Sequence, residues 1–185
     1  CTPLHVLTPH AGEAAALLIA LEDKGAAARE THRWNRERVE AHPGLAAREI
    51  CRLTGATVLL KGSTTLIAAP QRPLVSVDSG PGWMASAGSG DVLAGILGAV
   101  LAGAAARWEQ ETVPAASGPA SVDVLVESVA AGVRLHALAG AYAAASPQGA
   151  GGAGAGGHPI AALDIAAALG PARLELNRLQ AVPHP

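Results

Sequence analysis

Short apolar runs bounded by turn-forming residues predict β-strands in two parts of the chain. One run lies near the amino terminus, and three more follow one another closely. The runs are "LHVLT" at 4–8, "TVLLKG" at 57–62, "TTLIAAP" at 64–70 and "PLVSVDS" at 73–79. Because only small polar turns separate the last three, these strands are expected to be neighbours in one sheet.

Longer stretches rich in Ala and Leu predict helices between and after these strands. The first begins with Thr8 as its cap or with Pro9 in its first turn, and Gly55 ends the second. The last is broken near Gly170 and Pro171. The stretches are 8–22, 44–55, 92–106, 122–146 and 159–179.

The stretch 92–106 is apolar on every side. Leu93, Ile96, Leu97 and Val100 recur at helical spacing, and Gly and Ala fill the other positions. Such a helix is expected to be buried. The run is shorter than the ~20 residues of a membrane-spanning helix, so a core helix is the favoured interpretation.

Three segments interrupt this pattern. Residues 23–43 carry most of the charge of the first half and predict a solvated loop or helix face. Residues 113–121 resemble an inserted loop, and the glycine-rich segment 147–158 is of low complexity and resembles a linker. Since strands and helices otherwise interleave, the pattern favours an α/β layered fold.

Composition and charge limit the classes of binding partner but do not identify the function. The chain has 185 residues, enough for one domain, and a net charge of −2 with scattered Lys and Arg. This charge pattern predicts neither a nucleic-acid partner nor a membrane partner, and leaves a small molecule. Cys1 and Cys51 form no metal-binding spacing, which is typical of reduced thiols in a cytoplasmic protein.

A glycine-rich loop leads into the apolar helix and carries one carboxylate. Gly88, Ser89 and Gly90 offer backbone amides at a helix start, where anions bind well. Asp91 follows directly and would accept a proton from an alcohol while the amides steady a phosphoryl group. An ordinary interpretation stays open, in which Asp91 only favours the helix start.

Two further segments carry candidate chemistry. Lys61 ends one strand and is followed by a turn of hydroxyls and amides suited to phosphate: Gly62, Ser63, Thr64 and Thr65. His10 and Glu13 follow the first strand, and ligands collect at strand ends in α/β folds. A solvated Lys61 and a Glu13 that only caps its helix are the ordinary interpretations, and both stay open. His136 is expected to be a hydrogen-bonded core histidine.

Five segments together resemble the ADP- or ATP-dependent NAD(P)H-hydrate dehydratases of the ribokinase-like superfamily. They are "VLTPHAGE", "VLLKGSTTLIA", "GWMASAGSGDVLAGILGAVLAG", "AAGVRLHALAGAYAA" and "AALDIAAAL". The resemblance implies a mostly parallel sheet with helices on both faces. It also implies a nucleotide-dependent dehydration of the hydrated nicotinamide ring, in which a hydroxyl is phosphorylated and phosphate then leaves.

The resemblance also implies roles for the candidate residues. Asp91 matches the catalytic carboxylate and also contacts substrate, while 88–90 match the anion-holding loop. The segment 61–65 matches the part that holds the nucleotide phosphates. His10 matches the residue that lies against the hydrated cofactor, with Glu13 nearby. ADP or ATP and Mg²⁺ are implied as cofactors, with no Mg²⁺ ligand identified.

The chain departs from the family pattern in small residues and in extent. Ala11 stands where the family has Pro, Ala87 where it has Gly, and Ser79 where it has Asn. The family domain begins earlier, so residues 1–185 are expected to be the C-terminal portion of one domain without its N-terminal strands. A sheet edge left uncovered would pair with another copy, which predicts a homo-oligomer.

Two other functions remain open on sequence alone. One is a ribokinase-like kinase of a small alcohol, and the other is a non-catalytic nucleotide-binding fragment.

Overall fold

A computed structural model describes residues 2, 4–23, 33–110, 119–145 and 157–180 of the chain. At its centre lies a four-stranded sheet in the order β1-β2-β3-β4. The strands are β1 (Val6–Leu7), β2 (Thr57–Leu60), β3 (Thr64–Ala68) and β4 (Val75–Asp78). Each lies within one of the four apolar runs, so the predicted strands and their adjacency are confirmed.

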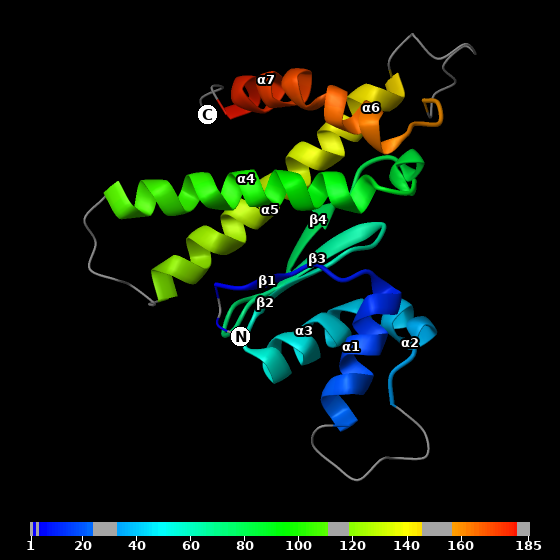
Figure 1. The fold of residues 1–185 in the computed structure, drawn as a ribbon, viewed down its shortest axis with the longest axis vertical. Coiled ribbons are helices and arrows are strands. Elements are labelled where there is room, and N and C mark those ends of the chain that lie inside the picture. Colours follow the sequence, from blue (N-terminus) through cyan, green and yellow to red (C-terminus); the bar gives the residue numbers. More distant parts are fainter. Residues whose placement is uncertain (1, 3, 24–32, 111–118, 146–156, 181–185) are drawn as a thin grey trace.

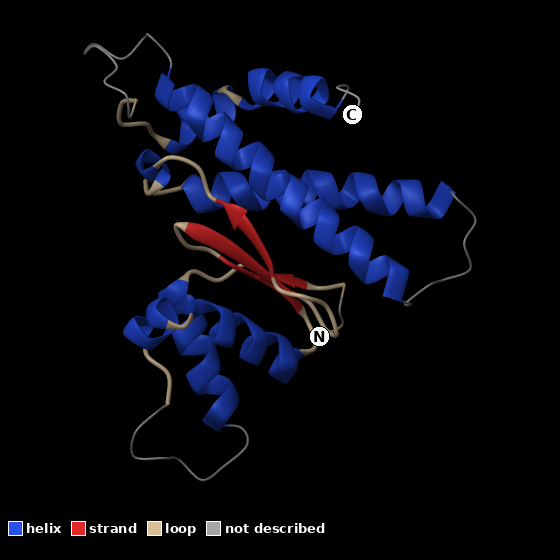
Figure 2. Cartoon of the chain, turned by 180° about the vertical axis from the view of Figure 1, so that it is seen from behind, coloured by secondary structure: helices blue, strands red, loops and turns tan. Residues whose placement is uncertain are grey.

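The sheet is mixed. β1 runs parallel to β2, whereas the pairs β2–β3 and β3–β4 are antiparallel. The expectation of a mostly parallel sheet is therefore wrong for the described strands, because short turns can join only antiparallel neighbours. β1 reaches β2 through a long crossover of three helices. The α/β class, with helices on both faces of the sheet, is confirmed (Figure 2).

One face of the sheet is covered by α1 (Ala11–Asp23), α2 (Arg36–Ala41) and α3 (Pro43–Thr54) (Figure 1). Val58 and Leu60 of β2 point into this layer and pack with Leu18 and Ile50. Gly55 ends α3 as predicted, with a left-handed φ of 72° and its amide donating to the Cys51 carbonyl at 2.8 Å.

The charged segment 23–43 contains more structure than expected. Asn35 caps α2 by accepting a hydrogen bond from the Arg38 amide at 2.8 Å. Trp34 lies just before it and is 3% exposed. This segment therefore contributes a buried anchor as well as the predicted solvated surface.

The opposite face is covered by α4 (Ser89–Gln110) and α5 (Pro119–Ala145) (Figures 1 and 2). Leu59 of β2, next to Val58 and Leu60 in sequence, points to this side because side chains alternate along a strand. It joins Ile67, Val77, Leu93, Leu97, Leu125, Val129 and Val133 in one apolar cluster.

A third layer packs on α5 and consists of α6 (Ala162–Ala167) and α7 (Leu169–Gln180). The short helix η1 (Gly82–Met84) places Met84 among their apolar side chains. The break between the two helices lies at Ala168, slightly before the predicted position. Gly170 and Pro171 lie in the first turn of α7, where Pro is tolerated because its missing N–H has no partner there.

The expectation that the apolar helix is buried on all sides is wrong for the described residues. Leu93, Ile96 and Leu97 of α4 are buried, but only 22% of Ser89–Ala106 is buried. α4 packs chiefly on α5, with further contacts to α6, and its outer side faces solvent. An apolar composition shows that a helix face is suited to burial, but it does not show whether another element covers that face.

Two described helices are long and apolar enough to cross a membrane by length and composition alone. They are Ser89–Ala106 and Ser121–Ala145, the second 44% buried. The first of these spans adds residues 89–91, including the charged Asp91, to the apolar stretch 92–106. Both spans are weak evidence for a membrane, because core helices of soluble proteins pass the same test.

Cys51 is a buried free thiol in α3, and burial raises its pKa. Cys1 lies outside the described residues, as do most of the predicted loops 113–121 and 147–158.

Candidate functional site

The first part of the site is the start of α1, directly after β1. The His10 ring caps the helix, because its Nδ1 accepts hydrogen bonds from the Gly12 and Glu13 amides, both at 3.1 Å. In return the Glu13 carboxylate accepts from the His10 amide at 2.7 Å. This reciprocal pair is a capping box with His in place of the usual Ser or Thr. The capping interpretation of Glu13 is therefore confirmed.

The capping geometry also indicates the tautomer of the neutral His10 ring. Because Nδ1 accepts two hydrogen bonds, the proton of the neutral ring is carried on Nε2. That Nε2 lies 3.6 Å from Glu13 Oε1, and 60% of the side chain is exposed. His10 thus presents an N–H donor to solvent at the carboxyl end of β1.

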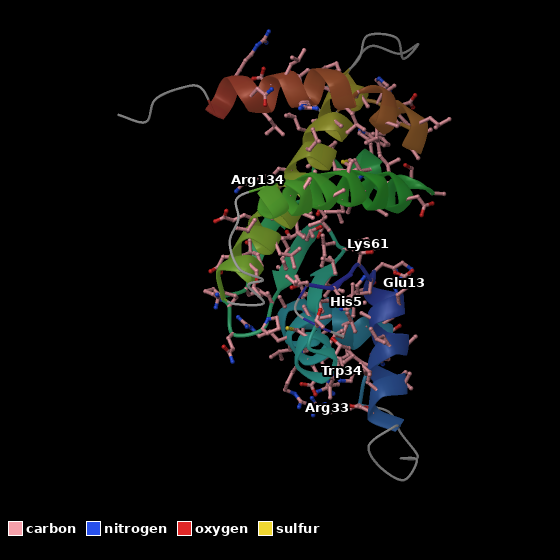
Figure 3. The ribbon with its side chains drawn as sticks, turned by 60° about the vertical axis from the view of Figure 1, so that its left-hand side comes forward. His5, Glu13, Arg33, Trp34, Lys61 and Arg134 are labelled. Carbon is pink, nitrogen blue, oxygen red and sulfur yellow. The ribbon has the colours of Figure 1, made fainter. Side chains whose placement is uncertain are left out.

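Lys61 joins this group from the end of β2. Its amide donates to the Pro9 carbonyl at 2.8 Å, which extends the parallel pairing of β1 and β2 as far as His10. Its Nζ lies 3.6 Å from Glu13 Oε2 (Figure 3). The His10 amide, with a smaller contribution from Lys61, holds the pKa of Glu13 below its ordinary value.

The start of α4 completes the arrangement. Gly88 has a left-handed φ of +85°, and its carbonyl accepts from the amides of Asp91 and Val92. A Cβ added to Gly90 would lie 3.4 Å from Lys61 Nζ, so the ammonium group lies over the first turn of α4. Asp91 is exposed on that turn. Segments far apart in sequence thus bring His10, Glu13, Lys61 and Gly90 together.

The backbone amides of the glycine loop are not all open. The Ser89 amide donates to the Ser86 carbonyl at 3.2 Å. Within the described part of the chain, the Gly88 and Gly90 amides have no hydrogen-bond acceptor. The loop therefore offers two amides to an anion, both from glycines.

Ser89 points away from this surface and into the core. His136 of α5 donates from Nε2 to the Ser89 carbonyl at 3.0 Å, and its ring lies near the Ser89 hydroxyl at 3.4 Å. Burial lowers the pKa of His136, against the opposing effect of this hydrogen bond. The predicted core role of His136 is confirmed, and its contact ties the start of α4 to α5.

The residues of the turn after Lys61 differ in their exposure to solvent. Gly62, Ser63 and Thr64 are exposed at the tip of the β2–β3 hairpin. Thr65 is 3% exposed, and its hydroxyl is hydrogen-bonded to that of Ser79 at 2.8 Å. Thr65 is therefore the member of this predicted set that is least accessible to a ligand.

Sequence reasoning missed one polar group in this region. The Ser86 hydroxyl is buried with no hydrogen-bond partner among the described residues. A buried hydroxyl without a hydrogen-bond partner costs free energy, and a hydrogen bond to a ligand or a water molecule would remove that cost. Its only sequence signal is its position in the glycine loop.

The described residues contain no group of three or more His, Cys, Asp or Glu side chains that would hold a metal ion. Mg²⁺ commonly binds through one or two carboxylates together with substrate phosphates and water, and such a site does not need a group of this size.

Known proteins match the part of the chain that contains these residues. The sequence profile of the NAD(P)H-hydrate dehydratases matches residues 3–151. The ADP-dependent (S)-NAD(P)H-hydrate dehydratase of Neisseria meningitidis is 39% identical over 141 residues, covering 76% of this chain and 42% of that protein. The bifunctional NAD(P)H-hydrate repair enzyme of Mycobacterium tuberculosis is 44% identical over 97 residues, covering 52% of this chain and 17% of that enzyme.

A solved structure shares the fold. The ADP/ATP-dependent NAD(P)H-hydrate dehydratase of Bacillus subtilis, co-crystallised with ATP and Mg²⁺, superposes with a TM-score of 0.59 at 20% identity. The superposition covers 92% of this chain and 47% of that one. The chain thus spans less than half the length of these relatives.

Proposed function

The chain belongs to the NAD(P)H-hydrate dehydratase family, and from this premise we propose that it catalyses nucleotide-dependent dehydration of hydrated NAD(P)H. The supporting observation is the convergence of Lys61, Glu13 and the first turn of α4. A cation, two open glycine amides and a carboxylate on one surface suit phosphoryl transfer to a hydroxyl.

The nucleotide phosphates would lie against Lys61 and the Gly88 and Gly90 amides. Lys61 contributes a charge-assisted contact, and the helix start contributes positive potential. The exposed hydroxyls of Ser63 and Thr64 extend this surface along the hairpin. The relative from Bacillus subtilis was co-crystallised with ATP and Mg²⁺, which supports an adenine nucleotide as a ligand of this chain.

The hydrated nicotinamide ring would lie between His10 and Asp91. The Nε2–H of His10 would donate a hydrogen bond to it. Asp91 accepts the proton of the ring hydroxyl. As it does so, the hydroxyl oxygen bonds to the terminal phosphorus of the nucleotide, and the bond between that phosphorus and the rest of the nucleotide breaks. Departure of that phosphate with its bonding electrons, and loss of a ring proton, then restores the double bond.

Mg²⁺ is part of this proposal through the nucleotide. It would neutralise phosphate charge and keep several water ligands. The chain's own residues position the phosphates and move the proton.

The test is incubation of the chain with hydrated NADH, Mg²⁺ and either ADP or ATP. Regain of the absorbance of NADH with release of phosphate is the expected result. Formation of a phosphorylated product without regain of absorbance indicates a kinase. Nucleotide binding without turnover indicates a binding fragment. Either of the last two outcomes contradicts the proposal.

Asp91→Asn tests the mechanism within that assay. Turnover is expected to fall roughly 10²–10⁴-fold because the base is lost, while stability changes by less than ~1 kcal/mol because Asn also suits a helix start. Asp123→Asn is the matched control, since Asp123 pairs with Arg72 away from the site. Similar activity in both variants contradicts the role of Asp91.

Assembly and location complete the proposal. The exposed apolar side of α4 supports a homo-oligomer in which another copy covers it. A monodisperse monomer in light scattering at micromolar concentration contradicts this. The buried free thiol of Cys51 supports a cytoplasmic location.

A further inference from the structure

A cavity with several charged side chains in its lining lies in the layer of α1, α2 and α3, away from the candidate site. Its volume is about 220 Å³, and four arginines line it: Arg33, Arg38, Arg48 and Arg52. The chain has eleven arginines in all, so this is a marked concentration. Figure 3 shows Arg33 and Trp34 at the end of this layer far from Lys61 and Glu13.

Two of the arginines are held on an aromatic ring. The guanidinium carbons of Arg33 and Arg38 each lie 5.6 Å from the centre of the Trp34 ring. Cation–π contact restricts these long side chains and thereby prepares them to bind. Arg48 and Arg52 lie one turn apart on α3, so they project from the same side of that helix.

The positive charge at the cavity is only partly neutralised. Glu49 accepts two hydrogen bonds from Arg52, at 2.8 and 2.9 Å. Arg33 lies 4.0 Å from Glu22. Arg48 contacts the Arg72 carbonyl at 3.4 Å, which carries no formal charge. Among the described residues, Arg38 and Arg48 have no carboxylate partner.

The Trp34 side chain supplies an independent sign of a ligand. It lines the cavity and is 3% exposed, yet its Nε1 has no hydrogen-bond partner among the described residues. An indole N–H only donates, and a buried donor without an acceptor is costly. An acceptor oxygen at this place would satisfy it.

We propose that this cavity binds a small organic dianion whose oxyanion is held by Arg38 and Arg48 and accepts a hydrogen bond from Trp34. Phosphate monoesters and dicarboxylates share this chemistry, because planar guanidinium groups bind both through paired hydrogen bonds. The cavity is smaller than the ~300–1,000 Å³ of sites for drug-sized ligands, which favours a small anion over a nucleotide. The site is separate from the proposed dehydration and does not depend on it.

Calorimetry with two probes at about 0.15 M salt tests the proposal. The probes are glycerol 2-phosphate and succinate, titrated into a Lys61→Ala background so that the candidate catalytic site does not contribute. We expect one of them to bind one-to-one with a Kd of about 1 mM or lower. The probe that binds identifies phosphate or carboxylate as the natural group. Absence of binding by both overturns the proposal.

Variants locate the binding. Arg38→Gln and Arg48→Gln are exposed substitutions that leave the core intact, and each is expected to weaken binding at least tenfold. Arg36→Gln is the matched control, since Arg36 pairs with Glu40 and does not line the cavity. Equal weakening in all three variants indicates general charge attraction and overturns the site.

The indole N–H signal of Trp34 gives a direct readout by NMR, assigned with Trp34→Phe. On addition of the binding probe, this signal is expected to move downfield as the N–H gains an acceptor. A Trp34 signal that stays in place while the probe binds contradicts the proposed geometry.

Discussion

Replacing Glu13 with Gln separates two roles of one carboxylate. Glu13 caps α1 by accepting from the His10 amide, and it lies 3.6 Å from the ammonium group of Lys61. Gln keeps an oxygen for the cap but has no charge. The variant is therefore expected to lose some stability and to gain affinity for a phosphate at Lys61.

The magnitudes follow from these contacts. Two unit charges at the 3.6 Å separation of Lys61 and Glu13 interact by ~1 kcal/mol in a medium like water. About half of the Glu13 side chain is exposed, so this figure suits the pair better than a buried estimate. Removing the competing carboxylate should tighten ADP binding roughly fivefold. The lost charge at the helix start should cost about 0.3–1 kcal/mol.

The assays are calorimetric titration with ADP and urea unfolding, each compared with Glu40→Gln. Glu40 likewise forms an ion pair, with Arg36, but it neither caps a helix nor contacts Lys61. The expected result is tighter ADP binding in the Glu13 variant alone. Unchanged or weaker ADP binding in Glu13→Gln would refute the reasoning that Lys61 is held by Glu13 and released to phosphate.

The pH dependence supplies a second check on Glu13. Its pKa in the folded state lies below the ordinary 4.5, chiefly because the His10 amide donates to the carboxylate. The unfolded chain therefore takes up the proton first as pH falls. The capping contribution is present above 4.5 and is lost as pH falls through the lower folded value. In Glu13→Gln this part of the acid destabilisation should disappear.

Three further predictions follow from other contacts. His136 has a lowered pKa, so stability should fall as pH drops below about 6.5, where the unfolded chain takes up the proton first, and His136→Gln should flatten that slope in urea unfolding. Gly88→Ala should destabilise by roughly 1–2 kcal/mol because φ is positive, whereas Gly98→Ala, with open space around its new methyl, should stabilise by up to ~1 kcal/mol; equal effects of the two changes on urea unfolding would contradict this. Cys51 should react slowly with iodoacetamide until the chain is unfolded, since burial raises its pKa and shields it; rapid labelling of native protein would contradict its burial.

Much of the fold was predictable because local signals agree with it. The four strands follow apolar runs between turns, and Gly55 ends α3 through a left-handed φ. The direction of strand pairing was not read correctly, although the short link from β2 to β3 required an antiparallel pair. The exposure of α4 was not predictable, because composition does not reveal which neighbours a helix has.

The residues of the candidate site were predicted better than the contacts between them. Lys61, His10 and Glu13 were each singled out, and the structure brings them together. That the His10 ring would cap α1 was not predictable, since His is an uncommon cap. The arginine cavity was missed because Arg33 precedes α2, Arg38 lies on α2, and Arg48 and Arg52 lie on α3, and the sequence alone does not show that these segments meet.

Lys61 follows β2, which pairs in parallel with β1 and antiparallel with β3. This arrangement affects the order in which the parts of the site come together during folding. The strands β2, β3 and β4 form a local meander, whereas Val6 of β1 must find Thr57 across the whole of α1, α2 and α3. Local pairs close sooner than distant ones, so docking of β1 is a late event in folding. Undocking of β1 separates His10 and Glu13 from Lys61 while most hydrogen bonds of the sheet persist. Ligand binding should accordingly disappear at a lower denaturant concentration than secondary structure.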